Sequence, residues 1–137
     1  MSNTVRKVDY FYTMVPNTAG KGAKIMSALA TEGVTLLAFS GFPSGKAAQL
    51  DLVPEDSAKL RRAAKRLGFK LSTKKSGFLV RGDDRVGAMT DILGKLAAAK
   101  INVTAIDAVS AGSGRYAAIF WVKPAKVAKA RKVLGAR

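Results

Sequence analysis

The sequence predicts an α+β protein made of two tandem ferredoxin-like βαββαβ units, antiparallel sheets with helices on one face, the second unit lacking its last strand. Two observations predict this fold. The segments that begin at Gly20 and Gly87 align without a gap at a constant offset of 67 residues. In both copies, apolar residues at strand spacing and at helical spacing alternate in the same order. We expect one repeat in residues 5–75 and a second in residues 76–137.

Each copy is expected to begin with a short strand, followed by a loop that ends in glycine and by an amphipathic helix. In the second copy Met89, Leu93 and Leu96 recur at helical spacing, which predicts one apolar face. Two strands follow in each copy. The glycine-containing segments Pro43–Gly45 and Ala111–Gly114 predict that each pair of strands forms a hairpin.

A second helix is expected near the end of each copy. Pro54 and Pro124 suit the first turns of these helices, and Gly68 and Gly135 suit their ends. Their apolar stripes leave a basic outer face, which is the ordinary arrangement of a solvated helix. The exposed cations of these two faces are Lys59, Arg61, Arg62, Lys65 and Arg66 in the first helix, and Lys126, Lys129 and Lys132 in the second.

The boundary between the copies is expected near Lys74–Gly77, between a closing strand at Phe69–Thr73 and an opening strand at Gly77–Arg81. The second copy ends just after its second helix, so its sheet is expected to have an open edge. Open edges pair with another strand or are covered. The segment Ser2–Val8, of this chain or of a neighbouring one, can fill the place, and the open edge is a reason to expect a homodimer.

Composition excludes several classes of function. With neither cysteine nor histidine, the chain has no disulfide, no thiolate metal site and no imidazole base, so we expect no metal and no cofactor. No apolar run is long enough for a membrane helix, and no signal peptide is present, which predicts a cytoplasmic protein without membrane contact. No side chains form a recognisable catalytic arrangement, so we do not expect an enzyme.

The second copy resembles the ACT domain family. The resemblance is carried by the segment from Gly82 to Leu93, which reads Gly-Asp-Asp-Arg-Val-Gly-Ala-Met-Thr-Asp-Ile-Leu, and by Lys100-Ile-Asn-Val103. The first copy matches more loosely, with Pro16-Asn-Thr-Ala-Gly20 and Gly33-Val-Thr-Leu36 at the corresponding places. The resemblance spans nearly the whole chain, apart from the missing last strand.

The resemblance implies a non-catalytic regulatory module that binds an amino acid or a similar small metabolite where two such units pair. The implied site uses the first loop, the start of the first helix and the start of the second strand. It also implies allosteric output through a partner enzyme or regulator. The expected ligand-binding residues are Asp83, Asp84, Arg85, Gly87 and Asn102 in the second copy, and Asn17, Thr18, Ala19 and Gly20 in the first.

Two other interpretations remain open. Asp84 and Thr18 can equally be helix caps, since both residue types accept hydrogen bonds from the N–H groups at a helix start. The net charge of +15 suggests nucleic-acid binding through a basic surface on the same fold. The charge is spread evenly, +8 in residues 1–75 and +7 in residues 76–137, and the aromatic pattern of an RNA-recognition strand is missing. We therefore do not expect nucleic acid as the main partner.

Overall fold

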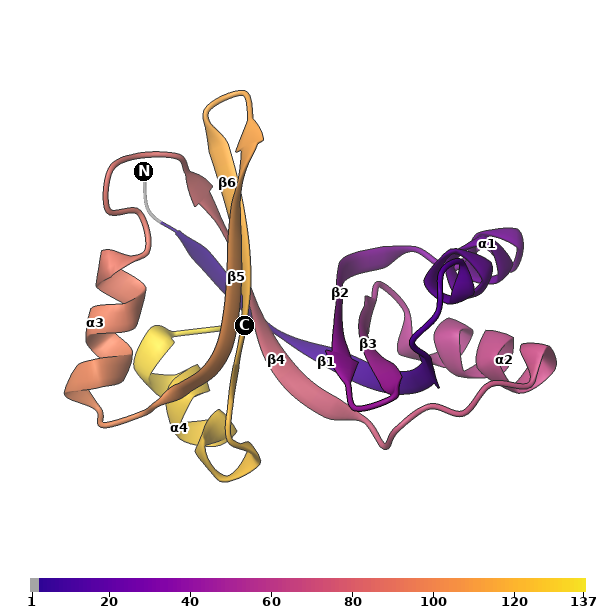
Figure 1. Ribbon diagram of the computed structural model, residues 1–137. Coiled ribbons are helices and arrows are strands. Elements are labelled where there is room, and N and C mark those ends of the chain that lie inside the picture. The colour runs from indigo at the N-terminus through magenta and orange to yellow at the C-terminus, as the bar shows by residue number, and fades with distance from the viewer. Residues whose placement is uncertain (1–2) are drawn as a thin grey trace. The chain divides into compact units, whose positions relative to one another are not determined.

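The computed structural model describes residues 3–137, which fold into two compact units (Figure 1). Residues 9–75 form the N-terminal unit. Residues 76–137, together with the segment that ends at Val8, form the C-terminal unit. Within the described residues the strands follow the order β2-β3-β1-β4-β6-β5. Strand β1, Thr4–Pro16, therefore supplies residues to both units.

The N-terminal unit places two helices against its part of the sheet (Figure 1). Its core consists of Phe11, Leu29, Leu50, Leu52 and Leu60, which come from both strands and helices, with Ala63. Strands β2 and β3 pair antiparallel, and β3 pairs antiparallel with β1. The elements after β1 are α1 (Lys21–Thr31), β2 (Leu36–Ser44), β3 (Ala47–Pro54) and α2 (Ser57–Leu67).

Helix α2 begins later than the sequence predicts. Pro54 is the last residue of β3, and Asp56 caps the helix by accepting a hydrogen bond from the backbone N–H of Lys59 at 3.2 Å. A carboxylate at this position satisfies an N–H group that has no partner inside the helix. The predicted end of the helix is confirmed, because Gly68 takes the left-handed conformation there.

The C-terminal unit has the same layered arrangement, with α3 and α4 on one side of its strands (Figure 1). Phe78 on β4 and Phe120 on β6 stack with ring centroids 5.2 Å apart. Ile92 and Leu96 bury the inner face of α3 against these strands. The elements are β4 (Lys75–Asp83), α3 (Thr90–Ala98), β5 (Val103–Gly112), β6 (Arg115–Val122), a 3-10 turn at Pro124–Lys126 and α4 (Val127–Leu134).

The N-terminal segment of the same chain supplies the strand that the second repeat lacks. Strand β1 lies beside β4, and the Thr4 hydroxyl donates to the carbonyl oxygen of Arg81 at 3.2 Å. Backbone hydrogen bonds also join Lys7 N–H to the Arg137 carbonyl and Arg137 N–H to the Val5 carbonyl. The prediction that this segment fills the open edge is confirmed for residues 4–8, whereas Ser2 lies outside the described residues. This edge is therefore no longer a reason to expect a dimer.

The predicted closing strand at Phe69–Thr73 does not form a regular strand. Ser72 N–H donates to the Tyr12 carbonyl at 2.8 Å, but Tyr12 N–H donates to the Ser72 hydroxyl instead of a backbone carbonyl. The Thr13 hydroxyl also donates to the Lys70 carbonyl at 2.7 Å. These side chains interrupt the ladder of backbone hydrogen bonds.

The segment expected to link the copies is also different, because β4 already begins at Lys75. Both predicted hairpins are present, although the first turn lies slightly later than expected: Pro43 and Ser44 still belong to β2, and β3 begins at Ala47. The repeat is visible in the backbone. Positive φ angles recur at the offset of 67 in four pairs of positions, which are 20 and 87, 33 and 100, 45 and 112, and 68 and 135.

Candidate functional site

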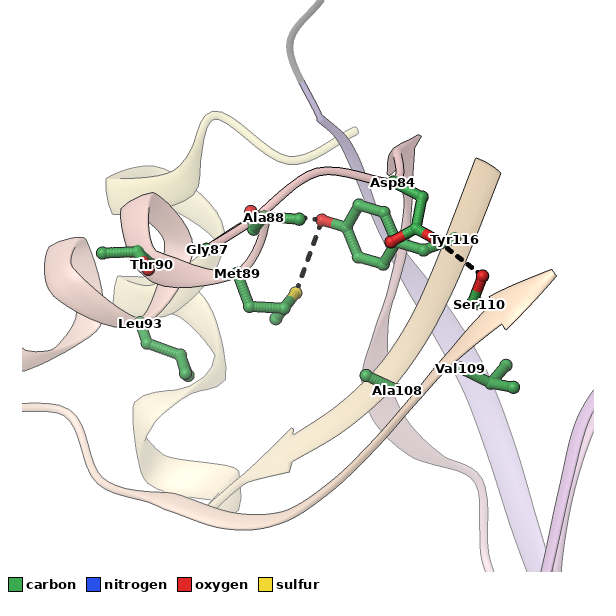
Figure 2. A pocket seen from close by; sticks show the side chains of 10 residues that line it. All are labelled: Asp84, Gly87, Ala88, Met89, Thr90, Leu93, Ala108, Val109, Ser110 and Tyr116. Atoms are coloured by element: carbon green, nitrogen blue, oxygen red, sulfur yellow. Dashed lines mark hydrogen bonds between the residues drawn. The ribbon is translucent and has the colours of Figure 1, made fainter. Parts of the chain in front are cut away.

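A pocket of about 380 Å³ lies in the C-terminal unit, between the loop that joins β4 to α3 and the facing part of β5 (Figure 2). Its lining includes both polar groups and apolar side chains. Both kinds of group are typical of sites that bind small molecules. The lining residues are Asp84, Gly87, Ala88, Met89, Thr90, Leu93, Ala108, Val109, Ser110 and Tyr116.

The carboxylate of Asp84 lines the pocket from the end of β4. Ser110 on β5 donates its hydroxyl to Asp84 Oδ2 at 2.6 Å, and the Asp84 N–H donates to the Gly114 carbonyl at 2.8 Å. These two bonds fix both the backbone and the side chain of Asp84. The capping interpretation is wrong for this residue, because α3 has Met89 at its N-cap position and no side-chain cap.

Gly87 shapes the turn that leads into α3. Its φ angle is +71°, a conformation that residues with a Cβ adopt only under strain. Around it, Ala88 N–H donates to the Arg85 carbonyl at 3.1 Å and Thr90 N–H donates to the Gly87 carbonyl at 2.9 Å. At Gly87 the backbone itself therefore lines the pocket, because this residue has no side chain to cover it.

Two other residues predicted for the site lie beside the pocket and not in its lining. The Arg115 guanidinium donates to Asp83 Oδ1 at 2.7 Å, across the β4–β6 pair. Arg85 lies 3.5 Å from Asp91 in the first turn of α3. Both ion pairs are partly exposed to solvent, so each contributes only modestly to stability.

Asn102 is far from the pocket within the same unit. It is exposed in the loop between α3 and β5, whereas Gly87 precedes the other end of α3. A helix of nine residues is about 13 Å long, at ~1.5 Å per residue. The structure therefore brings Asp84 and Gly87 together but leaves Asn102 at the opposite end of the helix.

The residues predicted in the first copy are exposed and line neither of the two pockets described in this section. Asn17 N–H donates to the Lys46 carbonyl at 3.2 Å, and Thr18 N–H donates to the Pro16 carbonyl at 2.9 Å. Ala19 follows in the turn, and Gly20 occupies the N-cap position of α1. Thr18 does not cap this helix, which lacks a side-chain cap.

Several lining residues were not predicted. Tyr116 is buried, and its hydroxyl lies 3.5 Å from the Ala88 carbonyl and 3.5 Å from Met89 Sδ (Figure 2). Ser110 and Val109 come from the end of β5. The available signal was the hairpin itself, because the Ala111–Gly114 turn places the end of β5 beside the start of β6.

A second pocket, of about 580 Å³, lies in the N-terminal unit between β1 and the irregular segment Phe69–Thr73. Its polar side chains Thr13 and Ser72 are already hydrogen-bonded to backbone groups. It is lined by Tyr12, Thr13, Met14, Gly68, Phe69, Lys70, Leu71 and Ser72.

Among residues 3–137, no group of three or more acidic side chains lies close enough together to hold a metal ion. In the same part of the chain, no helix is both long and apolar enough to cross a membrane.

Comparison with known proteins identifies the fold. No protein-family model and no curated protein matches the sequence. Among solved structures, a protein from Bacteroides thetaiotaomicron superposes with a TM-score of 0.82 at 17% identity, over 96% of this chain and 88% of that one. The regulatory subunit of aspartate kinase from Thermus thermophilus gives a TM-score of 0.66 at 14% identity, over 98% and 95%.

A third structure is a putative C-terminal regulatory domain of aspartate kinase from Porphyromonas gingivalis, with a TM-score of 0.54 at 15% identity, over 97% of this chain and 94% of that one. At these identities the likeness establishes the fold. The chain is therefore an α+β protein built of tandem ferredoxin-like units, as the sequence predicted.

Proposed function

We propose that this protein is a non-catalytic regulator that binds an amino acid or a similar small metabolite in the pocket beside Gly87. The observation that carries the proposal is the meeting of the Asp84 carboxylate, the Gly87 turn and the apolar residues of α3 and β5 around one small cavity. The shared fold with regulatory subunits of aspartate kinases supports a regulatory role.

The lining suits the two parts of an amino acid. The Asp84 carboxylate can accept hydrogen bonds from an ammonium group, and Ser110 already holds it in place at 2.6 Å. Leu93, Val109 and Met89 offer apolar surface to a side chain. The volume of about 380 Å³ is near the lower end of the range for ligand sites, which favours a small metabolite.

We propose that a second copy of the chain completes the site. Strand β5 is the outermost strand on its side of the sheet and is exposed along nearly its whole length. Antiparallel pairing of β5 with β5 of a second copy extends the sheet. Because the partner strand runs in the opposite direction, its Asn102 then lies near Ser110 and the pocket of the first copy. Ligand binding is thereby linked to dimer geometry, and through it to a partner enzyme or regulator.

A thermal-shift screen against the twenty amino acids tests the proposal, because a ligand that binds the folded state raises the midpoint of unfolding. We expect at least one amino acid to raise it, and Asp84→Asn to remove most of the rise. Glu55→Gln is the matched control, since it removes an exposed carboxylate in the other unit and should leave the rise unchanged. Equal responses of the two variants would exclude this pocket.

Two further variants test separate parts of the proposed site. Gly87→Val forces a Cβ into a turn with φ +71°, with Thr90 Oγ1 only 3.1 Å away, and should abolish binding. Asn102→Ala should weaken binding only if a second copy completes the site.

The same screen includes a DNA duplex and an RNA duplex at low and moderate salt. Stabilisation by nucleic acid that fades with salt, without any response to amino acids, would favour the basic-surface alternative.

A further inference from the structure

The N-terminal segment reaches the loop that forms the pocket. Asn3 Nδ2 donates a hydrogen bond to the Ala88 carbonyl at 3.1 Å, and the Tyr116 hydroxyl donates to Asn3 Oδ1 at 2.6 Å. Ala88 and Tyr116 both line the pocket. Asn3 therefore joins two parts of the pocket wall that come from different elements, the turn before α3 and strand β6.

The Tyr116 hydroxyl is a hydrogen-bond donor that keeps its proton. Its side chain is buried, and burial raises the pKa of the Tyr116 phenol above its ordinary value, while the charge of Arg85 opposes this shift. The hydroxyl therefore keeps its proton at neutral pH. The Ala88 carbonyl and Met89 Sδ each lie 3.5 Å from this hydroxyl, so Tyr116 is close to both residues that follow Gly87, while Asn3 holds Ala88 by a hydrogen bond.

The neighbouring strand is shaped to admit this pair. A Cβ atom at Gly82 on β4 would collide with Asn3 Oδ1, and it would lie only 2.8 Å from Cε1 of Tyr116. The φ angle of Gly82 is not in the left-handed region, so the backbone itself does not require glycine there. The absence of a side chain at this position makes room for Asn3.

We propose that Asn3 is a positioning residue for the ligand pocket, which adopts its binding shape only while the N-terminal segment is docked beside β4. This inference rests on the proposed function and deepens it. The segment then does more than complete a sheet: it sets the position of the turn around Gly87, and anything that releases the segment lowers the affinity for the ligand.

Hydrogen exchange of the full-length chain without ligand tests the positioning directly. The reporters are the amides of Ala88 and Thr90, which are bonded within the turn. Asn3→Ala should raise their exchange roughly three- to tenfold, the effect of losing one or two buried hydrogen bonds. Asn3→Asp keeps an acceptor for Tyr116 but places a carboxylate oxygen against the Ala88 carbonyl, so it should raise the exchange rates at least as much.

Thr4→Val is the matched control, because it removes a hydrogen bond from the same segment to Arg81 on β4 and keeps Asn3, whose side chain bonds to the turn. We expect the Ala88 and Thr90 amides of Thr4→Val to exchange at the same rates as those of the unmodified chain. Equal exchange in Asn3→Ala and Thr4→Val would overturn the inference.

Affinity measurements with the amino acid identified by thermal shift provide the second readout. Asn3→Ala and Tyr116→Phe should each weaken binding, whereas Thr4→Val should not. If Asn3→Ala loosens the turn but affinity is unchanged, the inference is also overturned. If the turn loosens and the unmodified chain binds no amino acid, the proposed function fails while the structural role of Asn3 in the turn stands.

Discussion

Asp51 is a buried carboxylate on β3 of the N-terminal unit. It is 8% exposed and accepts a hydrogen bond from Gln49 Nε2 at 2.9 Å. Burial raises the pKa of Asp51 above its ordinary value of 3.8, and the bond from Gln49 only partly opposes that shift. The folded state thus binds this proton more strongly than the unfolded chain, so stability falls as pH rises above ~4 through the raised pKa.

Asp51→Asn should therefore stabilise the protein at pH 7, because it removes the cost of a buried charge while keeping an acceptor for Gln49. The advantage over the unmodified chain should shrink as pH falls and vanish where Asp51 is protonated in both states. Thermal midpoints measured from pH 3 to pH 8 check this. An advantage that does not change with pH would show that the charge is not the cause.

Lys100 adopts a left-handed conformation, with φ +59°, where the equivalent residue of the first copy is Gly33. This conformation costs a residue with a Cβ roughly 1 kcal/mol. Lys100→Gly should therefore stabilise the fold by up to ~1 kcal/mol. The greater flexibility of glycine in the unfolded chain offsets part of this gain. Lys95→Gly, inside α3, is the control and should destabilise by ~1 kcal/mol. Chemical unfolding of both variants decides the sign.

At the residue scale, the sequence predicted some members of the candidate site and not others. Asp84 and Gly87 followed from the loop motif of the resemblance, in which they stand three positions apart just before a helix. Asn3 and Tyr116 are separated by 113 positions, and no local pattern records a contact over that distance. Asn102 followed from the family resemblance, and only the structure reveals that it lies at the other end of α3.

Among the elements, β5 is an edge strand whose outer side is open to pairing with another chain. Its ten residues contain one charged side chain, Asp107, and neither lysine nor proline, the residues that usually protect an edge strand. Val109 is 64% exposed on it. These features support the dimer proposed for the site, and they concern a different edge from the one that first suggested a dimer.

Val109→Lys should lower the dimer fraction, because a charge on an edge strand opposes pairing with a second strand. Val86→Lys places the same charge at a residue that is 99% exposed in the loop before α3 and should not change the dimer fraction. Sedimentation velocity over a range of concentrations measures both. A monomer at all concentrations in the unmodified chain would remove the proposal of a second copy.

Helices and hairpins were predictable because periodicity and glycine positions report them directly. The closing strand at Phe69–Thr73 was not, because its apolar residues fit a strand while Ser72 and Thr13 divert its hydrogen bonds. The start of α2 was displaced for a similar reason: Asp56 caps the helix two residues after Pro54, and capping geometry outweighed the preference of proline for a first turn.

For the whole molecule, the two units differ in how completely the nearby sequence supplies their parts. The core cluster of the N-terminal unit and the apolar residues packed against it lie between Phe11 and Leu71. The C-terminal unit also needs the segment that ends at Val8, whose Val5 packs against its core. The fold class followed from the repeat, whereas the place of residues 4–8 beside β4 is seen in the structure.

Separated fragments should therefore behave differently. Residues 9–75 should give a cooperative unfolding transition, whereas residues 76–137 alone should expose the edge of β4 and self-associate. Joining residues 3–8 to the second fragment through a flexible linker should restore a soluble, cooperative unit. Circular dichroism and size-exclusion chromatography check these outcomes. A well-behaved fragment 76–137 would mean that the added strand is dispensable.

The pairing of residues 4–8 with β4 and Arg137 also sets an order of events during synthesis. Residues 4–8 are made before the N-terminal unit, whereas their partners are made after it. The N-terminal unit can form while the preceding segment is still unpaired, and the C-terminal unit closes only after its own strands and α4 have been made. Until then the segment is an unpaired strand, which exposes the chain to association with other strands.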